Sequence, residues 1–89
     1  MIHSSITISN KLGLHARASA KLTKLAGSFR SEIFLSRNGR RVNAKSIMGV
    51  MMLAAGMGAS VDIDIDGPDE AEAMAEIRAL IDSRFGEED

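Results

Sequence analysis

The segment from Val61 to Asp66 constrains the fold of this 89-residue chain more than any other part of the sequence. Three apolar β-branched residues alternate there with three aspartates, a period of two that is typical of a strand with one buried face and one solvated face. The apolar face of such a strand must be covered by a second layer of structure. The length is enough for one thin core, so we expect a single domain over residues 1–89.

Three further segments are predicted to be strands. A similar alternation starts at Ile2 and continues to Ser9, with isoleucines on the buried side. Two more strands are predicted at residues 32–37 and 40–43, on either side of Asn38-Gly39. Both turn residues tolerate the positive φ of a type I′ turn, which makes this pair the strongest hairpin signal in the chain.

The first helix is predicted over residues 16–26, with its start near His15 and Gly27 at its C-cap. One side of this helix is apolar and the opposite side is basic, which is typical of a helix that packs on a sheet. The apolar stripe consists of Ala18, Leu22, Leu25 and Ala26, and the basic face consists of Arg17, Lys21 and Lys24.

Two more helices are predicted from residues that typically begin a helix. Ser46 is a good N-cap for a short helix expected over residues 47–56, whose length is limited by Gly49, Gly56 and Gly58. Gly67-Pro68 is expected to open the last helix, with proline at its first position. The core stripe of this helix is expected to comprise Met74, Ile77, Ile81 and Phe85, and the acidic tail at 86–89 is expected to fray. The order β-α-β-β-α-β-α indicates an α+β two-layer sandwich with a mostly antiparallel four-stranded sheet.

Composition excludes several classes of function. The chain has no cysteine, so a disulfide framework and a Cys-ligated metal are excluded. Its three phenylalanines are its only aromatic residues and its net charge is −1, so a nucleic-acid surface is not expected. No apolar run is long enough to insert into a membrane and no secretory signal is evident, so the expected location is cytoplasmic.

No metal or cofactor is expected. Asp62, Asp64 and Asp66 imitate the start of a calcium loop, but the twelfth position holds Ala73 instead of the required glutamate. Gly56-Met57-Gly58 lacks the third glycine of a dinucleotide-binding loop.

His15 is the strongest candidate for chemistry, and its side chain is expected to be exposed. It lies where a glycine-containing loop meets the start of a helix, and unpaired backbone N–H groups at a helix start suit a phosphate. An unprotonated imidazole is a nucleophile near neutral pH, and the guanidinium of Arg17 suits phosphate oxygens. The alternative from spacing alone is an inert surface histidine, which is the interpretation we give to His3.

The short helix after Ser46 offers a candidate interaction surface. Its apolar residues fall on two sides, and a short helix cannot bury both in a two-layer domain, so one side is expected to be exposed to partners. The side expected to be exposed carries Ile47, Met48, Met51 and Met52, and the other carries Val50, Leu53 and Ala54. Ser46 itself is either a simple cap or a site where a phosphate would bring about two negative charges beside this surface.

Two segments together carry a resemblance to a known family. Gly13-Leu14-His15-Ala16-Arg17-Ala18-Ser19 resembles the active-site motif of HPr, the histidine-containing phosphocarrier of the bacterial sugar phosphotransferase system. Lys45 to Ala55 resembles the regulatory-serine segment of the same family. The resemblance covers essentially the whole chain and implies an open-faced sandwich with strand order 1-4-2-3 and three helices on one face.

The resemblance also implies roles and partners. His15 would accept a phosphoryl group, on the ring nitrogen nearest the backbone, from phospho-Enzyme I, which phosphoenolpyruvate charges. It would then pass the group to a histidine of sugar-specific enzyme IIA domains, with Arg17 stabilising the phosphate and no independent turnover. Ser46 would be the site of an ATP-dependent HPr kinase/phosphorylase. The residues expected to bind partners are Ala16, Ala20, Lys21, Lys24, Ile47, Met48, Met51 and Met52.

One departure from the family and several alternatives remain. Members commonly have proline where this chain has Ala18, a change that leaves His15 and Arg17 in place. A nitrogen-branch phosphocarrier would share the same chemistry with different partners. A regulatory α+β module that transfers nothing is a further alternative, whereas an RNA-binding domain is disfavoured by the scarcity of aromatic residues. A monomer is expected from size and family.

Overall fold

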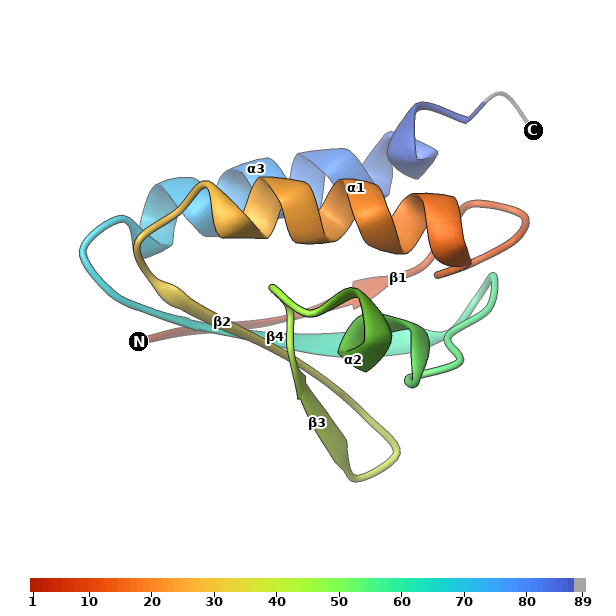
Figure 1. Cartoon of the computed structure of the whole chain (residues 1–89), viewed down its shortest axis with the longest axis horizontal. Coiled ribbons are helices and arrows are strands. Elements are labelled where there is room, and N and C mark those ends of the chain that lie inside the picture. Colours follow the sequence, from red (N-terminus) through yellow and green to blue (C-terminus); the bar gives the residue numbers. More distant parts are fainter. Residues whose placement is uncertain (88–89) are drawn as a thin grey trace.

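The computed structural model describes residues 1–87 and contains a four-stranded antiparallel sheet in the order β1-β4-β2-β3 (Figure 1). The elements are β1 (Ile2–Thr7), α1 (Ala16–Gly27), β2 (Glu32–Arg37), β3 (Arg40–Asn43), α2 (Ile47–Met51), β4 (Ser60–Asp66), α3 (Glu70–Asp82) and the 3₁₀ turn η1 (Arg84–Gly86). This arrangement confirms the predicted fold class, strand order and hairpin.

The strand register places the apolar residues in rows on one face of the sheet. Ile63 of β4 lies opposite Leu35 of β2, and Ile65 lies opposite Ile33. On the other side of β4, Val61 pairs with Ile6 of β1. All of these side chains are buried, so the alternation visible in the sequence sets which face of the sheet becomes the core.

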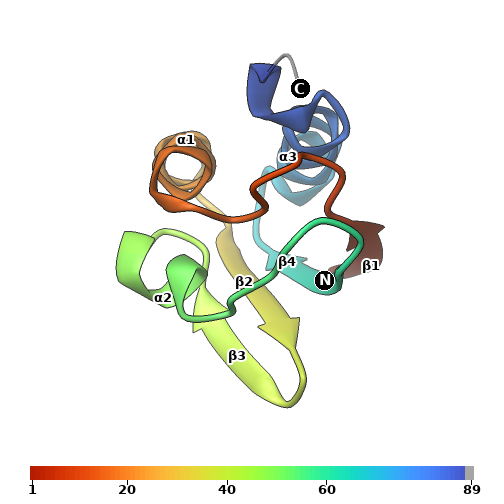
Figure 2. The same cartoon turned by 90° about the vertical axis from the view of Figure 1, so that its right-hand side faces the viewer.

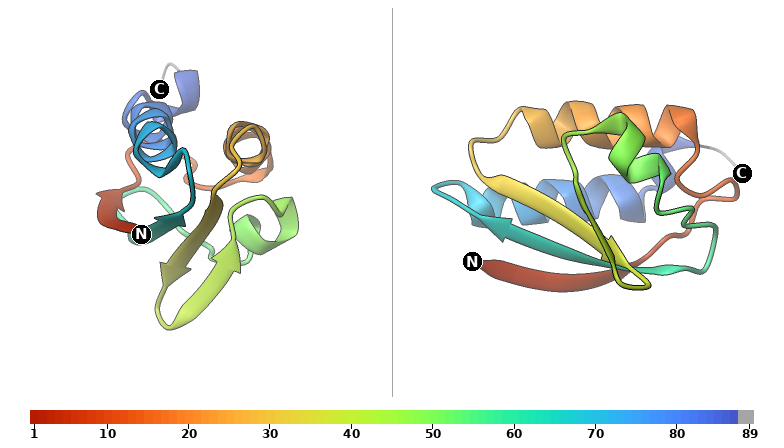
Figure 3. Two further views of the ribbon diagram at one scale, coloured as in Figure 1. Left: turned by 90° about the vertical axis from the view of Figure 1, so that its left-hand side faces the viewer. Right: turned by 60° about the horizontal axis from the view of Figure 1, so that its bottom comes forward.

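The helices cover that apolar face, as the two views of Figure 3 show. α1 and α3 lie side by side on the sheet, and α2 packs beside α1 near β3 (Figure 2). The helix residues that complete the core are Ala18, Leu22, Ala26, Val50, Ala73, Ile77 and Ile81. The apolar stripes predicted for the first and last helices therefore face the sheet, with Leu25 and Met74 only partly buried at their margins.

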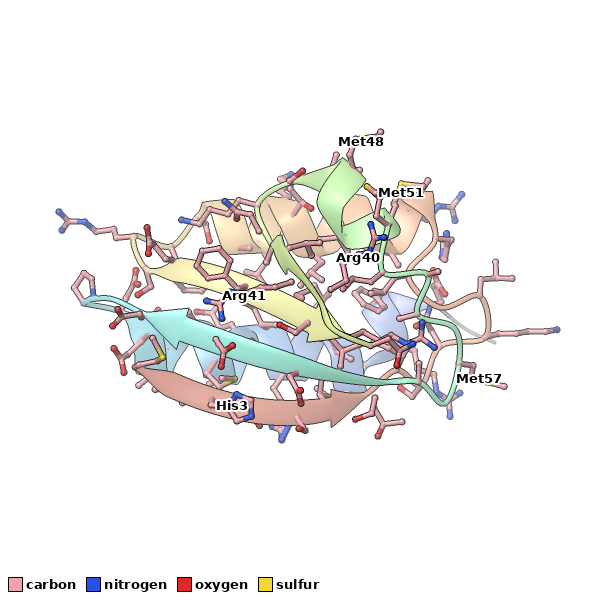
Figure 4. The ribbon with its side chains drawn as sticks, turned by 90° about the horizontal axis from the view of Figure 1, so that it is seen from below. His3, Arg40, Arg41, Met48, Met51 and Met57 are labelled. Carbon is pink, nitrogen blue, oxygen red and sulfur yellow. The ribbon has the colours of Figure 1, made fainter. Side chains whose placement is uncertain are left out.

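The opposite face of the sheet is uncovered and polar (Figure 4). His3 Nδ1 lies 2.6 Å from an oxygen of Asp64, and Arg41 approaches the other oxygen of that carboxylate at 3.2 Å. Asp62 accepts a hydrogen bond from Ser5. The acidic strand face therefore pairs with its neighbours across the sheet, and His3 is a surface histidine as predicted.

Element boundaries differ from the sequence prediction at several points. α3 begins at Glu70 and not at Pro68, and Phe85 lies beyond the end of α3 in η1. α1 extends through Gly27, and its C-cap is Ser28. The short helix was expected over residues 47–56 but ends at Met51. It contains Gly49 and stops well before Gly56, so the glycines do not set its end; Ala54 has a positive φ of 51° instead.

The start of α3 is marked by long-range contacts of the Asp69 side chain, the residue before Glu70. This carboxylate accepts hydrogen bonds from the backbone N–H of Arg30 (2.9 Å) and from both the N–H and the hydroxyl of Ser31 (3.0 and 2.5 Å). It therefore ties the start of α3 to the loop before β2. The Ser31 hydroxyl and then the Arg30 N–H hold the pKa of Asp69 below its usual range.

Asp69→Asn is expected to lower the free energy of unfolding at pH 7, because an amide oxygen cannot replace the charge that these three donors face. A carboxyl group whose pKa is depressed by folding stabilises above its unfolded pKa of about 4 and loses that effect as pH falls through the folded value. The deficit relative to the unmodified chain should therefore shrink between pH 7 and pH 2 in urea titrations. The exposed Asp82→Asn, at the opposite end of the same helix, is the control and should cost no stability. An equal deficit at both pH values for Asp69→Asn would contradict this account.

Candidate functional site

His15 lies at one end of the sandwich, where three segments distant in sequence meet. The loop before α1, the turn after α2 and the C-terminal turn η1 all reach this end (Figures 1 and 2). His15 is the N-cap residue of α1 with extended backbone (φ −75°, ψ 179°), and its carbonyl accepts the first helical hydrogen bond from Ser19. The side chain makes no capping hydrogen bond, so the ring is available for another role.

The loop before His15 is fixed by close backbone packing. Gly13 has φ +66°, and a Cβ at this position would lie 2.4 Å from the carbonyl oxygen of Ala55. The N–H of Leu14 donates to that same oxygen at 2.9 Å. The fully buried Asn10 donates to the carbonyl oxygen of Gly13 at 2.7 Å. Together these contacts set the position of His15 relative to the turn after α2.

The start of α1 supplies donors beside the ring. The N–H groups of the exposed residues 16 and 17 precede the first helical hydrogen bond and are available to an anion, as the helix dipole favours. Arg17 is exposed and lines the same hollow as His15. The hollow is lined by Leu12, His15, Ala16, Arg17, Lys21, Gly86 and Glu87. It is open and carries two cationic side chains, which suits a small anion attached to the ring.

Glu87 is an unexpected member of this group and contacts the ring of His15. One of its carboxylate oxygens lies 2.7 Å from His15 Nε2, and its other oxygen accepts from Asn10 at 3.2 Å. The hydrogen bond with His15 is the main reason that the pKa of Glu87 lies below its usual range. Glu87 is therefore a carboxylate at neutral pH and accepts from the ring nitrogen.

Two sequence expectations are wrong here. His15 was expected to be exposed, but its side chain is only 26% exposed because Glu87 covers it. The tail was expected to fray from Gly86, but Glu87 is packed at 13% exposure; residues 88 and 89 lie outside the described part. The signal that could have revealed this is Phe85. Its expected burial already required the chain to follow the core as far as residue 85.

The apolar surface predicted on α2 is present. Val50 and Leu53 are buried, whereas Ala54, expected on the same side, lies beyond the end of α2 and is exposed. Met48 and Met51 project from α2 in Figure 4, and Met57 lies on the turn that follows. The exposed large apolar residues of this region are Leu12, Ile47, Met48, Met51, Met52 and Met57. Leu12 is the member that the sequence gave no reason to include. We call this set the methionine surface.

The predicted partner-binding residues of α1 are also exposed. Ala16, Ala20, Lys21 and Lys24 are on the solvent side of the helix, and α1 packs against α2. An exposed basic helix face therefore lies next to the methionine surface. Their role in binding partners stays a prediction.

Ser46 caps α2 as predicted. Its hydroxyl oxygen accepts a hydrogen bond from the N–H of Gly49 at 3.1 Å, and the side chain is exposed. Its regulatory role stays a prediction.

Two further observations concern residues 1–87. Within that range, no three histidine or acidic side chains group closely enough to bind a metal ion. None of the helices described there has both the length and the apolarity to cross a membrane.

Comparisons with known proteins agree on one family. The family model described as PTS HPr component phosphorylation site matches residues 2–83. The phosphocarrier protein HPr of Cupriavidus necator is 67% identical over 87 residues, which cover 98% of both chains. A crystal structure of HPr from Thermoanaerobacter tengcongensis superposes with a TM-score of 0.95 at 44% identity, covering 99% of both chains. An HPr dimer from the same organism gives a TM-score of 0.79 at 44% identity, covering 98% of this chain and 100% of the other.

Proposed function

Since the chain belongs to the HPr family of phosphocarrier proteins of the phosphotransferase system, we propose that His15 carries the phosphoryl group, on Nδ1. The observation that supports this assignment most directly is the geometry of the ring. His15 lies beside the free N–H groups of α1 and beside Arg17, and its Nε2 is already engaged by Glu87. Nδ1 is therefore the nitrogen assigned to phosphorus.

The proposed reaction is a transfer between two histidines. The lone pair of Nδ1 attacks phosphorus of phospho-Enzyme I, the bond between phosphorus and the donor nitrogen breaks, and its electron pair returns to the donor imidazole. In the next step a histidine of an enzyme IIA domain attacks the phosphorus on His15. The bond between phosphorus and Nδ1 then breaks, and its electron pair returns to the His15 ring. The N–H groups of residues 16 and 17 and the Arg17 guanidinium stabilise the charge on the phosphoryl oxygens. The chain acts as a stoichiometric carrier in the cytoplasm, without independent turnover, metal or cofactor.

The methionine surface and the basic face of α1 are proposed to dock both partners. Charge on α1 would speed encounter with an acidic partner, and the exposed apolar area would give a modest and reversible affinity. Methionine suits this use because its flexible side chain adapts to different partner surfaces. We propose that the chain acts as a monomer, so that this surface stays free.

The direct test is charging of the purified protein. It is incubated with phosphoenolpyruvate, magnesium and a bacterial Enzyme I, and its intact mass is then measured. One acid-labile phosphoryl group is expected, and it should disappear after an enzyme IIA domain is added. Reactions without phosphoenolpyruvate or without Enzyme I are the controls. No charging, while a known HPr is charged in the same tube, would favour a nitrogen-branch donor or a regulatory module that transfers nothing.

We further propose that phosphorylation of Ser46 by an HPr kinase/phosphorylase weakens docking. Ser46→Asp is expected to slow phosphorylation by Enzyme I about ten-fold, because a negative charge beside the methionine surface repels an acidic partner. Ser46→Asn is the matched control, since asparagine caps a helix as well as aspartate but adds no charge. Initial rates over a range of protein concentrations provide the measurement. Equal rates for the Asp and Asn variants would rule out charge repulsion.

A further inference from the structure

The chain after α3 follows a strained path that returns it to the start of α1. Arg84, Phe85 and Gly86 have φ values of +59°, +57° and +75°, three consecutive residues in the left-handed region. Only glycine adopts this conformation without cost, so the two residues before it are held there by their surroundings. Strain of this kind persists where tertiary contacts compensate for it, and it concentrates at functional sites.

Two contacts hold this left-handed turn against α1. Phe85 is 1% exposed and packs into the core, so it anchors the turn. Lys21, on α1, donates from Nζ to the carbonyl oxygen of Phe85 at 2.7 Å. The next residues are therefore directed toward the first turn of α1, where His15 lies.

The carboxylate of Glu87 is held at both oxygens. Asn10, fully buried, donates to one oxygen at 3.2 Å, and His15 Nε2 lies 2.7 Å from the other. Asn10 also donates to the carbonyl oxygen of Gly13, so the same amide fixes the loop before His15 and the carboxylate beyond it. Since an ionised carboxylate has no proton to donate, Nε2 must carry the hydrogen in this contact.

We propose that Glu87 is a positioning residue for phosphoryl transfer. It holds the proton of His15 on Nε2, which leaves the lone pair on Nδ1, and it offsets the positive charge that the ring acquires when Nδ1 bonds to phosphorus. This inference rests on the proposed function of His15 and assigns a role to a residue outside both recognised motifs.

The proton balance of the step supports this role. Attack by Nδ1 forms the new bond to phosphorus while the proton stays on Nε2, so the ring becomes a phosphorylated imidazolium. The carboxylate 2.7 Å from Nε2 faces that charge. The two cationic side chains of the hollow, Arg17 and Lys21, have different roles. Among residues 1–87 Arg17 has no hydrogen-bond or ion-pair partner and can meet the phosphoryl oxygens, whereas Lys21 is engaged with Phe85.

A purely structural role for Glu87 makes a different prediction. If its carboxylate only tied the tail to the loop through Asn10, its loss would reduce stability and leave the ring nitrogens unchanged. The decisive measurement is therefore the ¹⁵N spectrum of His15, recorded on the free protein at a pH where the ring is neutral. No phosphoryl donor or partner protein is needed.

Three variants separate the two roles. In the unmodified chain, Nε2 should have the shift of a protonated nitrogen and Nδ1 that of an unprotonated one. In Glu87→Ala the two shifts should move toward each other, because the ring samples both tautomers. Glu87→Gln should keep the pattern of the unmodified chain, since its amide oxygen still accepts from Nε2. Glu76→Ala, which removes an exposed glutamate from α3, is the matched control and should change neither shift.

Charging rates test the electrostatic part of the proposal. Glu87→Ala is expected to be charged by phospho-Enzyme I about ten-fold more slowly, as suits the loss of a charge-assisted hydrogen bond. Glu87→Gln should lie between that variant and the unmodified chain, because it keeps the tautomer but removes the negative charge. Thermal unfolding of each variant establishes that the fold is retained.

The outcomes distinguish this inference from the proposed function. Unchanged ring shifts in Glu87→Ala, or equal charging rates for that variant and Glu76→Ala, would overturn the role of Glu87 while leaving His15 as the carrier. If the unmodified chain accepts no phosphoryl group at all, the proposed function fails and this inference fails with it, whatever the ring shifts show.

Discussion

His15→Ala is expected to abolish phosphoryl acceptance and to leave the fold intact. Removing the imidazole removes the nitrogen proposed to attack phosphorus. The other nitrogen-bearing side chains that line the hollow are Arg17, a guanidinium, and Lys21, which is held on the carbonyl oxygen of Phe85. The fold should tolerate the change because the His15 side chain makes no helix-capping hydrogen bond. The backbone contacts on either side, from Leu14 to Ala55 and from Ser19 to His15, do not depend on the ring.

The matched control for this experiment is the second histidine of the chain. His3 lies on the open face of the sheet beside Asp64, so His3→Ala should be charged like the unmodified protein. Intact mass after incubation with phosphoenolpyruvate and Enzyme I gives the acceptance, and circular dichroism gives the fold. A phosphoryl group retained by folded His15→Ala would move the site elsewhere.

Gly13→Ala is expected to cost about 3 kcal/mol of unfolding free energy and to slow phosphoryl acceptance. A Cβ at residue 13 would lie 2.4 Å from the oxygen of Ala55 and 2.6 Å from the Cα of Gly56, both backbone atoms that cannot rotate away. The positive φ adds strain of its own. The clash can be relieved only if the loop that positions His15 moves. The free energy of unfolding and the rate of phosphoryl acceptance should therefore decrease together.

Gly27→Ala is the control for this second prediction. Gly27 lies at the end of α1, and an added Cβ there meets no atom within 4 Å. Alanine should therefore stabilise the helix by about 0.5–1 kcal/mol and leave acceptance unchanged. Urea unfolding and charging rates of the two variants provide the comparison. A Gly13→Ala protein as stable as the unmodified chain would show that the loop is not held by this close approach.

Secondary structure and the antiparallel four-stranded sheet could be predicted because local signals agreed with the tertiary fold, whereas the strand order was implied only by the resemblance to the HPr family. The aspartate alternation in β4, the Asn38-Gly39 turn and the Ser46 cap each depend on a few adjacent residues. The boundary of α3 could not be predicted in the same way. Asp69 looks like a residue of the first helical turn, but its carboxylate bonds to Arg30 and Ser31, which are distant in sequence.

The candidate site also contains residues that local sequence could predict and residues that it could not. His15 and Arg17 are two residues apart, so a loop and a helix start were enough to predict them together. The exposure of Ile47, Met48, Met51 and Met52 was predicted from helical spacing, because a two-layer domain cannot bury both sides of a short helix. Leu12 could not be added from spacing, because its exposure depends on the path of the loop before α1.

By itself, the sequence determined the strands, the approximate helices and the residues that can do phosphoryl chemistry, because each depends on a local period or on the nature of one side chain. Only the tertiary structure brought Glu87 to Nε2 of His15, across 72 positions of sequence. That contact depends on the burial of Phe85 and on the hydrogen bond from Lys21, which together compensate for a left-handed turn that local preferences disfavour. The nucleophile is therefore encoded locally, whereas the state of its ring depends on long-range packing.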